Sequence, residues 1–430
     1  MTEPLIKIAG LYKLFGRSPS KHMGLVKEGL PKDEILKKTG HTLGLKDINL
    51  EINRSEIYVI MGLSGSGKST LIRHFNRLID PTEGRVEVEG QDIMELNDAQ
   101  LRDFRRKKMS MVFQRFGLLP HKTVVDNVAF GLKVRGIGKE ERQKKAQQWL
   151  DDVGLKGYED QYPGQLSGGQ QQRVGLARAL CTDAEILLMD EAFSALDPLI
   201  RSEMQDQLIE LQEKLHKTII FITHDLDEAL RIGDRIAILR DGELVQVGEP
   251  ADILLNPADD YVEKFVRDVN RARALTVDTV MKPAKFRISA ETVGEALKEM
   301  RTSKHEYAYN VTDEGYQGAL SLDQLEEMDK SSYSDPLCDE HYYDSDVNVE
   351  PDAVIEEVIP DTLDQEYPIP VVDEDGKLQG ELTRDTIAEV LSPHTEPEAE
   401  ETEEAEAKEA EAESEAKKEK EKEEEIAKAP

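Results

Sequence analysis

Residues 62–70 read Gly-Leu-Ser-Gly-Ser-Gly-Lys-Ser-Thr, and this stretch decides the fold of the chain. It follows the apolar run 57–61, which is typical of a buried strand, and it leads into the helical pattern of residues 70–75. The spacing fits G-x-x-x-x-G-K-[ST], in which glycines let the backbone turn tightly so that several N–H groups point at one anion. The following helix adds the positive end of its dipole. The stretch therefore predicts a nucleotide-binding loop.

Two side chains of this loop carry specific chemistry. Lys68 is expected to reach the β- and γ-phosphates, and the Ser69 hydroxyl is expected to ligate Mg²⁺. A glycine turn without a ligand is the alternative, but the strand before it and the helix after it favour a nucleotide. The residues predicted to contact the nucleotide are Gly62, Ser64, Gly65, Ser66, Gly67, Lys68, Ser69 and Thr70.

A second apolar run, residues 186–189, ends in the carboxylates Asp190 and Glu191. Beside a phosphate loop, Asp190 is expected to help hold Mg²⁺, directly or through water. Glu191 is expected to orient or deprotonate the attacking water. Taken alone, the pair would be explained equally well by a strand end followed by a polar turn.

Residues 167–170 are Ser167, Gly168, Gly169 and Gln170, and a helical stretch follows them. A serine and two glycines at a helix start form an anion cradle, because the first N–H groups of the helix point at the ligand. The alternative is an ordinary capped helix start. The two carboxylates that follow at close range favour a second phosphate-binding segment.

The composition limits the classes of protein that the chain can be. It has 430 residues, with 88 Asp and Glu against 55 Lys and Arg, a net charge of −33. This excess of acid excludes a generally basic nucleic-acid binder, because phosphate backbones require clustered positive charge. Two distant cysteines predict no disulfide framework, and there is neither a signal-peptide pattern nor an apolar run of membrane-spanning length. We therefore expect a soluble cytosolic protein of more than one domain.

The chain is predicted to begin with an α/β domain over residues 1–275, in which strand and helix patterns alternate. Residues 17–44 form a polar insertion in this domain, and residues 98–165 form a mostly helical subdomain. The net charge of residues 1–275 is about −3, whereas residues 276–430 carry about −30. The acid is therefore a local feature of the C-terminal third.

The C-terminal third contains a weak internal repeat. The segments 318–323, Gly-Ala-Leu-Ser-Leu-Asp, and 380–385, Gly-Glu-Leu-Thr-Arg-Asp, close two similar stretches. They predict two small α+β modules, over residues 276–335 and 336–392. Chance similarity in an acidic region is the alternative. Residues 393–430 consist mainly of Glu, Ala and Lys and are predicted to be a disordered acidic tail, because they offer no apolar face to bury.

Taken together, these motifs resemble those of the ATP-binding-cassette (ABC) ATPases. Five of them occur in the order of that family over about 250 residues. They are the phosphate loop, residues 166–170, the pair Asp190–Glu191, Ser-Ala-Leu-Asp at 194–197 and Thr-His-Asp at 223–225. The resemblance implies an α/β fold of the P-loop nucleoside-triphosphatase class with a helical subdomain. It also implies an ATPase that uses ATP and Mg²⁺.

The resemblance implies further roles for single residues. Phe15 matches the aromatic residue that stacks on adenine, with Tyr12 as the rival candidate. Gln114 matches the glutamine that senses Mg²⁺ and the γ-phosphate, and His224 matches the histidine that contacts the γ-phosphate. Asp197 matches the acidic residue that crosses a dimer interface.

Cassettes of this family pair head to tail, so that each ATP lies between the phosphate loop of one chain and the Ser167–Gln170 segment of the other. The chain has one such set, and the resemblance therefore implies a homodimer. It also implies a separate transmembrane permease as the partner.

One branch is especially similar: the ATP-binding subunits of glycine betaine/proline-type osmoprotectant importers. The resemblance rests on Gly-Leu-Pro-Lys-Asp-Glu-Ile-Leu at 29–36, the run 105–114, the run 190–201 and the repeat pair, which resembles tandem cystathionine-β-synthase-type (CBS) modules. It implies ATP-driven import of such solutes at the cytoplasmic side of the inner membrane, with a peripheral ATPase and a substrate-binding protein or domain. An importer of another small solute, such as an amino acid or polyamine, is the alternative, and a non-transport cassette protein is a third reading.

Regulation through the C-terminal third is a hypothesis with several forms. CBS modules that hold adenosine often end with Gly, two apolar residues, Ser or Thr, two residues and Asp, and both copies here are one residue shorter before Asp323 and Asp385. A cyclic dinucleotide at the pair and sensing of ionic strength are two alternatives, the second because charges interact over about 10 Å at 0.1 M salt and less at higher salt. The acidic tail is either part of this sensor or a solubilising appendage.

Overall fold

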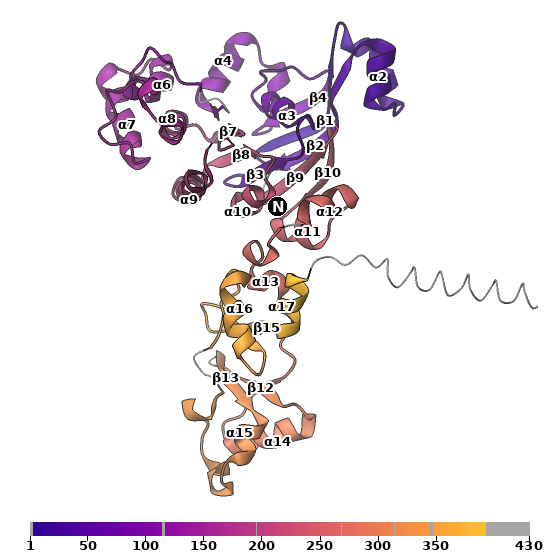
Figure 1. Ribbon diagram of the computed structural model, residues 1–430, viewed down its shortest axis with the longest axis vertical. Helices are drawn as coiled ribbons and strands as arrows, with labels where there is room; N and C mark the ends of the chain where they lie inside the picture. The colour runs from indigo at the N-terminus through magenta and orange to yellow at the C-terminus, as the bar shows by residue number, and fades with distance from the viewer. Residues whose placement is uncertain are drawn as a thin grey trace, which may run out of the picture. The chain divides into compact units, whose positions relative to one another are not determined.

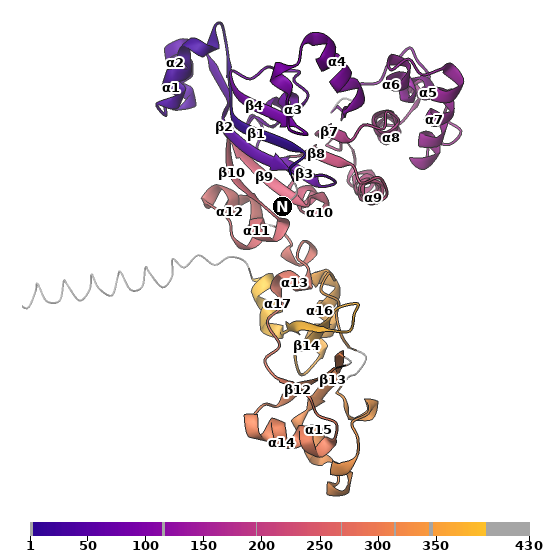
Figure 2. The same ribbon diagram turned by 180° about the vertical axis from the view of Figure 1, so that it is seen from behind.

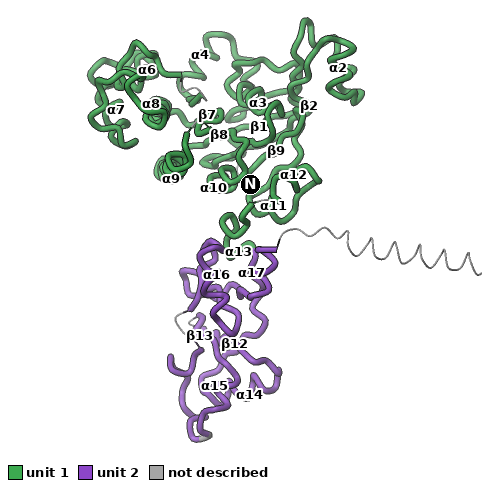
Figure 3. The backbone as a smooth tube through the Cα atoms, viewed as in Figure 1, with its two compact units in different colours: residues 1–279 green, residues 280–430 purple. Residues whose placement is uncertain are grey.

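The computed structural model describes residues 3–113, 117–194, 196–267, 269–313, 315–343 and 347–392. The chain separates after Thr279 into two compact units, residues 1–279 and 280–430 (Figure 3). Gln114 and the predicted tail at 393–430 lie outside the described residues.

The first unit is built on a six-stranded sheet whose strands are parallel except for one edge strand. In spatial order the strands are β10 (Glu243–Gly248), β9 (Arg235–Arg240), β3 (Ile57–Met61), β8 (Thr218–Ile222), β7 (Ile186–Asp190) and β6 (Met109–Val112). Strand β10 is the antiparallel one. Strands β3, β7 and β8 are buried along their whole length. Parallel strands covered on both faces need continuous apolar sequences, which explains the unbroken runs in the chain.

A second, antiparallel sheet of four strands shares its core with the first. In spatial order the strands are β2 (Thr42–Ile52), β1 (Ile6–Phe15), β4 (Glu83–Val88) and β5 (Gln91–Asp92). Apolar side chains of β1 and β2 pack in one cluster with helix α3 (Lys68–Phe75) and with the six-stranded sheet. The helix that follows the phosphate loop is therefore fixed between the two sheets.

Helices around residues 124–180 form a separate core. It is built from α5 (Val124–Val128), α6 (Phe130–Val134), α7 (Lys139–Asp152) and α8 (Gly168–Leu180). Figures 1 and 2 show these helices gathered at one end of the unit. Helix α4 (Asp98–Lys107), which lies in the predicted helical subdomain, contributes Leu101 to the core of the sheets instead. Helix α8, which follows the predicted range, contributes to the helical core.

The first unit also contains the helices α9 (Pro198–Leu215), α10 (Leu226–Ile232), α11 (Pro250–Leu255) and α12 (Asp260–Val266), and α13 (Val277–Val280) lies at its boundary with the second unit. Among the helices that the structure describes, none combines the length and the hydropathy needed to cross a bilayer.

The predicted insertion folds onto the end of strand β1. Its helices α1 (Met23–Lys27) and α2 (Lys32–Thr39) bury an apolar cluster with Leu14 and Leu43. The imidazole of His41 closes the base of the insertion: its Nδ1 lies 2.8 Å from the carbonyl oxygen of Thr39 and its Nε2 lies 2.9 Å from that of Arg17. The insertion is thus a small packed layer.

The second unit contains the same order of elements twice. The first copy has α14 (Val293–Ser303), β12 (Tyr307–Thr312), β13 (Gly315–Ser321) and α15 (Leu322–Glu327), with the short strand β11 (Arg287–Ile288) parallel to β12. The second copy has α16 (Ile355–Asp364), β14 (Ile369–Val372), β15 (Leu378–Leu382) and α17 (Arg384–Leu391). The weak sequence repeat therefore corresponds to a repeated helix–hairpin–helix unit.

Residues just after the boundary predicted between residues 335 and 336 contact the first copy. Leu337 and Tyr342 pack in the apolar cluster of the first copy, and the N–H of Leu337 donates to the carbonyl of Glu291 at 2.9 Å. Tyr343 pairs with Ala319 on β13. These contacts tie the segment between the two copies to the first copy, and sequence similarity between the copies carries no trace of them.

The side chain of His74, on α3, is buried at 1 % exposure. Its Nδ1 donates to the carbonyl of Thr70 at 2.7 Å, and its Nε2 is buried without a hydrogen-bond partner among the described residues. Burial lowers the pKa of His74 from 6.5 to about 4. Between these two values the unfolded chain binds a proton that the folded chain does not, so this histidine makes stability fall as the pH falls.

We expect His74→Phe to reduce the acid sensitivity of the first unit. Because the phenyl ring cannot be protonated, the variant should lose about 2 kcal/mol less stability than the wild type between pH 6.5 and 5. Urea denaturation at each pH, followed by circular dichroism, measures the difference. The exposed His121→Phe should keep the wild-type pH dependence, and an unchanged slope in His74→Phe would contradict the assignment.

Candidate functional site: the nucleotide loop

The predicted phosphate loop connects β3 to α3 and is shaped by close backbone contacts. Gly62 has a φ of +147°, and a Cβ there would lie 2.2 Å from the carbonyl oxygen of Leu239. Gly67 has a φ of +110°, and a Cβ there would lie 2.8 Å from the carbonyl oxygen of Gly44. Only glycine fits both the conformation and the space. No side chain among the described residues caps α3, so its first N–H groups are available to an anion.

The Lys68 side chain is buried behind this loop at 4 % exposure. Its Nζ donates to the carbonyl oxygens of Gly62, at 2.7 Å, and Leu63, at 3.1 Å. Burial lowers the pKa of Lys68, and the nearby carboxylates of Glu191 and Asp190 oppose that effect. A phosphate group would supply the opposite charge that this buried cation requires.

Ser69 and Asp190 meet at the carboxyl end of the sheet. The Ser69 hydroxyl donates to Oδ1 of Asp190 at 2.9 Å, and the guanidinium of Arg73 lies 3.7 Å from Oδ2. A hydroxyl and a carboxylate are oxygen ligands that suit Mg²⁺. The described residues contain no cluster of three or more His, Cys, Asp or Glu side chains able to hold a metal. Further ligands would therefore come from phosphates and water, as is usual for Mg²⁺.

Glu191 and His224 lie beside this pair. Glu191 follows β7 with a φ of 47°, a strained conformation for a residue with a side chain. Its N–H donates to the carbonyl of Ile222 at 3.1 Å, which joins the ends of β7 and β8. Oε2 of Glu191 lies 4.0 Å from Nδ1 of His224, whose side chain is 56 % exposed. The two side chains can face a water molecule and the terminal phosphate of a nucleotide.

The second predicted cradle lies in the helical region. Ser167 caps α8 by accepting a hydrogen bond from the N–H of Gln170 at 3.3 Å, and the Gln170 side chain accepts from the N–H of Ser167 at 3.0 Å. Gly168 and Gly169 form the first turn of this helix. The capped helix start is thus present, and its role as an anion cradle stays a prediction.

The remaining predicted residues have defined places. Phe15 ends β1 with 37 % of its surface exposed, whereas its rival Tyr12 packs against the apolar cluster of the insertion. Asp197 caps α9, where its Oδ1 accepts from the N–H of Ile200 at 3.1 Å. Their predicted contacts, with adenine and across a dimer, stay predictions, as does the role of Gln114.

Sequence reasoning missed the turn that supports the loop from behind. Gly242, between β9 and β10, donates its N–H to the carbonyl of Ser66 at 2.8 Å and accepts from the N–H of Lys46 at 2.8 Å. Asp241-Gly242 is a typical hairpin turn, which was the available signal. Its contact with the phosphate loop spans more than 170 residues and has no local sequence pattern.

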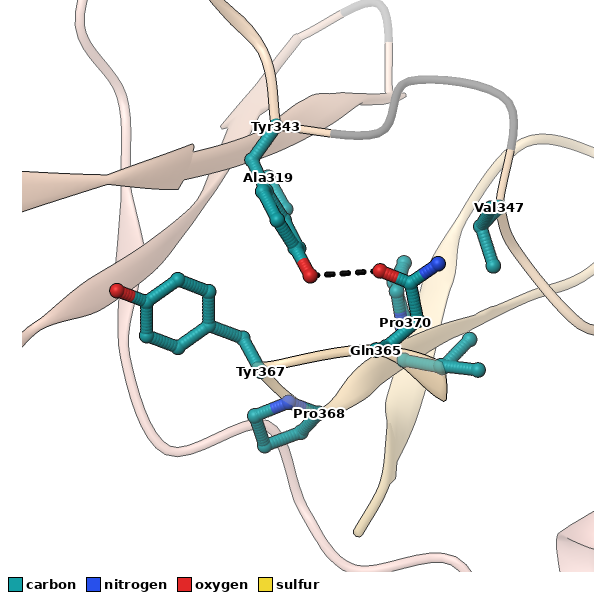
Figure 4. A pocket seen from close by; sticks show the side chains of 8 residues that line it. Ala319, Tyr343, Val347, Gln365, Tyr367, Pro368 and Pro370 are labelled. Atoms are coloured by element: carbon teal, nitrogen blue, oxygen red, sulfur yellow. Dashed lines mark hydrogen bonds between the residues drawn. The ribbon is translucent and has the colours of Figure 1, made fainter. Parts of the chain in front are cut away.

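A small cavity in the second unit lies between its two copies. Tyr343 follows the first copy, while Gln365 and Tyr367 come from the second. These three side chains line the cavity together with Ala319, Pro368 and Pro370 (Figure 4). The Tyr343 hydroxyl donates to Oε1 of Gln365 at 2.6 Å, and the rings of Tyr343 and Tyr367 meet edge to face at 5.1 Å. The cavity measures about 10 Å³, which is room for about one water molecule.

Comparisons with known families match both units. The ABC transporter model matches residues 45–194, and the CBS domain model matches residues 342–393. The first range contains the phosphate loop, the capped start of α8 and the two carboxylates.

Two curated relatives match almost the whole chain. It is 47 % identical over 392 residues to the glycine betaine/proline betaine transport system ATP-binding protein ProV of Escherichia coli (strain K12), over 90 % of this chain and 97 % of that protein. It is 46 % identical over 391 residues to the glycine betaine transport ATP-binding protein OpuAA of Bacillus subtilis (strain 168). That match covers 91 % of this chain and 93 % of that protein.

A solved structure matches the first unit. The structure of cbiO1 from Clostridium perfringens, part of the ABC transporter complex cbiONQ, aligns with a TM-score of 0.50 and 27 % identity over 62 % of this chain and 95 % of that one. The predicted cassette fold is therefore confirmed.

We expect Glu191→Gln to abolish hydrolysis while keeping nucleotide binding. The amide keeps the size of the side chain but cannot take a proton from water, so ATPase activity should fall by about 10²–10⁴-fold. Phosphate release measures hydrolysis, and equilibrium dialysis measures ATP binding. Glu213→Gln, an exposed substitution on α9, should retain full activity. Wild-type turnover in Glu191→Gln would rule out this role.

Proposed function

The chain belongs to the family of ABC transporter ATP-binding proteins that these betaine transport subunits represent, and on that premise we propose that it energises the import of glycine betaine and related compatible solutes. The observation that carries this proposal is the 47 % identity to ProV, which runs through 90 % of the chain and takes in both units. A likeness confined to the cassette would support ATP hydrolysis but no solute class.

The geometry of the loop accounts for the ATPase activity. The N–H groups at the start of α3 and the buried Lys68 would bind the phosphates, and Phe15 would stack on the adenine. Ser69 and Asp190 would hold Mg²⁺, which supplies charge neutralisation on the phosphates when bound. Glu191 would take a proton from the attacking water, and His224 would contact the terminal phosphate. Preorganised charge of this kind is the main source of catalysis in phosphoryl transfer.

The same premise extends to the partners. Because the chain has a single phosphate loop and a single Ser167–Gln170 segment, we infer a homodimer in which each chain completes the other's site. Hydrolysis would act on a separate permease at the cytoplasmic face of the membrane, supplied with solute by a binding protein or domain.

Regulation by the second unit is part of the proposal. Residues 276–392 carry a net charge of about −20, twice that of the tail, so ionic strength is a natural input. A cyclic dinucleotide at the CBS pair stays a prediction.

We expect Ser69→Ala and Asp190→Asn to raise the Mg²⁺ requirement. Each removes an oxygen ligand, so the Mg²⁺ concentration for half-maximal ATPase activity should rise about tenfold or more. Titration of Mg²⁺ at saturating ATP measures the shift, and a separate ATP titration excludes a loss of nucleotide affinity. An unchanged Mg²⁺ dependence in both variants would contradict the assignment.

Reconstitution tests the transported solute. Proteoliposomes that contain the chain with its co-purified permease should accumulate radiolabelled glycine betaine when ATP is supplied, and Lys68→Ala should abolish uptake. Excess unlabelled proline betaine should compete, whereas an amino acid or polyamine should not. Uptake of the latter without betaine uptake would favour the alternative solute, and co-purification with ribosomes instead of a permease would overturn a transport function.

A further inference from the structure

Helix α12, at the end of the first unit, reaches the phosphate loop through one side chain. The hydroxyl of Tyr261 accepts a hydrogen bond from the N–H of Leu63, the second residue of the loop, at 3.5 Å. The same hydroxyl donates to the carbonyl oxygen of Leu239, at the end of β9, at 3.3 Å. It therefore bridges two segments that are more than 170 residues apart in sequence.

The tyrosine ring is held in place from several sides. The guanidinium of Arg240 lies over the ring at 4.9 Å from its centre, and the ring of Phe265 meets it edge to face at 5.0 Å. Asp259 binds Arg240 at 2.8 Å and also caps α12 by accepting from the N–H groups of Tyr261 and Val262. A side chain fixed by packing, charge and a helix cap presents its hydroxyl at a defined position.

The bridge through Tyr261 adds to contacts that the phosphate loop makes with the β9–β10 hairpin. The carbonyl of Leu239 lies against Gly62, where a Cβ would meet it at 2.2 Å, and the N–H of Gly242 donates to the carbonyl of Ser66. The hairpin thus supports the loop at both ends, and Tyr261 fixes the segment between them. None of these contacts uses the N–H groups at the start of α3.

We propose that Tyr261 is a positioning residue for ATP: its hydroxyl holds the phosphate loop in its binding conformation and couples helix α12 to the occupancy of the site. A loop that is already ordered loses less conformational freedom when the nucleotide binds, so the bridge strengthens binding without touching ATP. Coupling between two sites is reciprocal, and ATP must therefore stabilise α12 in turn.

The kinetic test uses Tyr261→Phe in the full chain. Because this substitution removes only the hydroxyl, the KM for ATP should rise about two- to tenfold, as expected for one hydrogen bond, while kcat changes less than about twofold. Tyr58→Phe is the matched control, since the Tyr58 hydroxyl is buried without a partner in the described part of the chain. It should leave both constants unchanged. A KM for ATP in Tyr261→Phe within about 1.5-fold of the wild type would overturn the proposal.

Hydrogen exchange distinguishes coupling from a merely structural role, because only coupling makes the protection of α12 depend on bound nucleotide. A non-hydrolysable ATP analogue should slow amide exchange in residues 259–266 of the wild type, and this protection should be lost in Tyr261→Phe. Equal protection in both proteins, or none in the wild type, would contradict the coupling. The proposal rests on ATP binding by the cassette and not on the solute, so both experiments use soluble chain and nucleotide alone. A failed betaine uptake assay would leave them unaffected.

Discussion

The nucleotide loop can form only where three backbone segments approach more closely than a β-carbon would allow. Gly62 lies against the carbonyl of Leu239, and both Gly67 and Gly242 lie against the carbonyl of Gly44, where added β-carbons would be 2.2, 2.8 and 2.7 Å away. Strand β2, the β9–β10 hairpin and the loop therefore meet backbone to backbone. This contact joins the antiparallel sheet to the parallel one beside the loop that is proposed to bind the phosphates.

The charges around Lys68 favour a bound anion. Lys68 is buried, the carbonyls of Gly62 and Leu63 accept from its ammonium group, and the carboxylates of Glu191 and Asp190 offset only part of the effect of burial on its pKa. Asp190 already accepts from Ser69, and a bound cation would take the place of that hydroxyl proton. A phosphate opposite the lysine, together with Mg²⁺ held by Ser69 and Asp190, would pair these charges. Bound ATP would then relieve the desolvation cost of the buried lysine, which would favour binding.

Local patterns in the sequence were sufficient for the parts of the fold that depend on local physics. The continuous apolar runs predicted the buried parallel strands, and carboxylates at a strand end predicted the place where Asp190 meets Ser69. The contacts of Gly242 and Tyr261 with the loop were missed, because each depends on the packing of segments distant in sequence. The contacts of the residues after the predicted boundary at 335/336 were missed for the same reason, since the bridge between Tyr343 and Ala319 exists only in the folded chain.

The second unit is interlocked in a way that bears on how charge can act on it. Lys282, before the first copy, pairs with Glu381 of the second, while Tyr343, after the first copy, pairs back onto it. The bridge between Lys282 and Glu381 therefore ties the start of the unit to its second copy. The net charge of about −20 on residues 276–392 is uneven, with about −5 on residues 276–335 and about −15 on residues 336–392. Added salt would therefore screen repulsion mainly within the second copy. Because residues 276–392 carry about twice the net charge of the tail, the folded modules offer more charge to a salt response than the tail does.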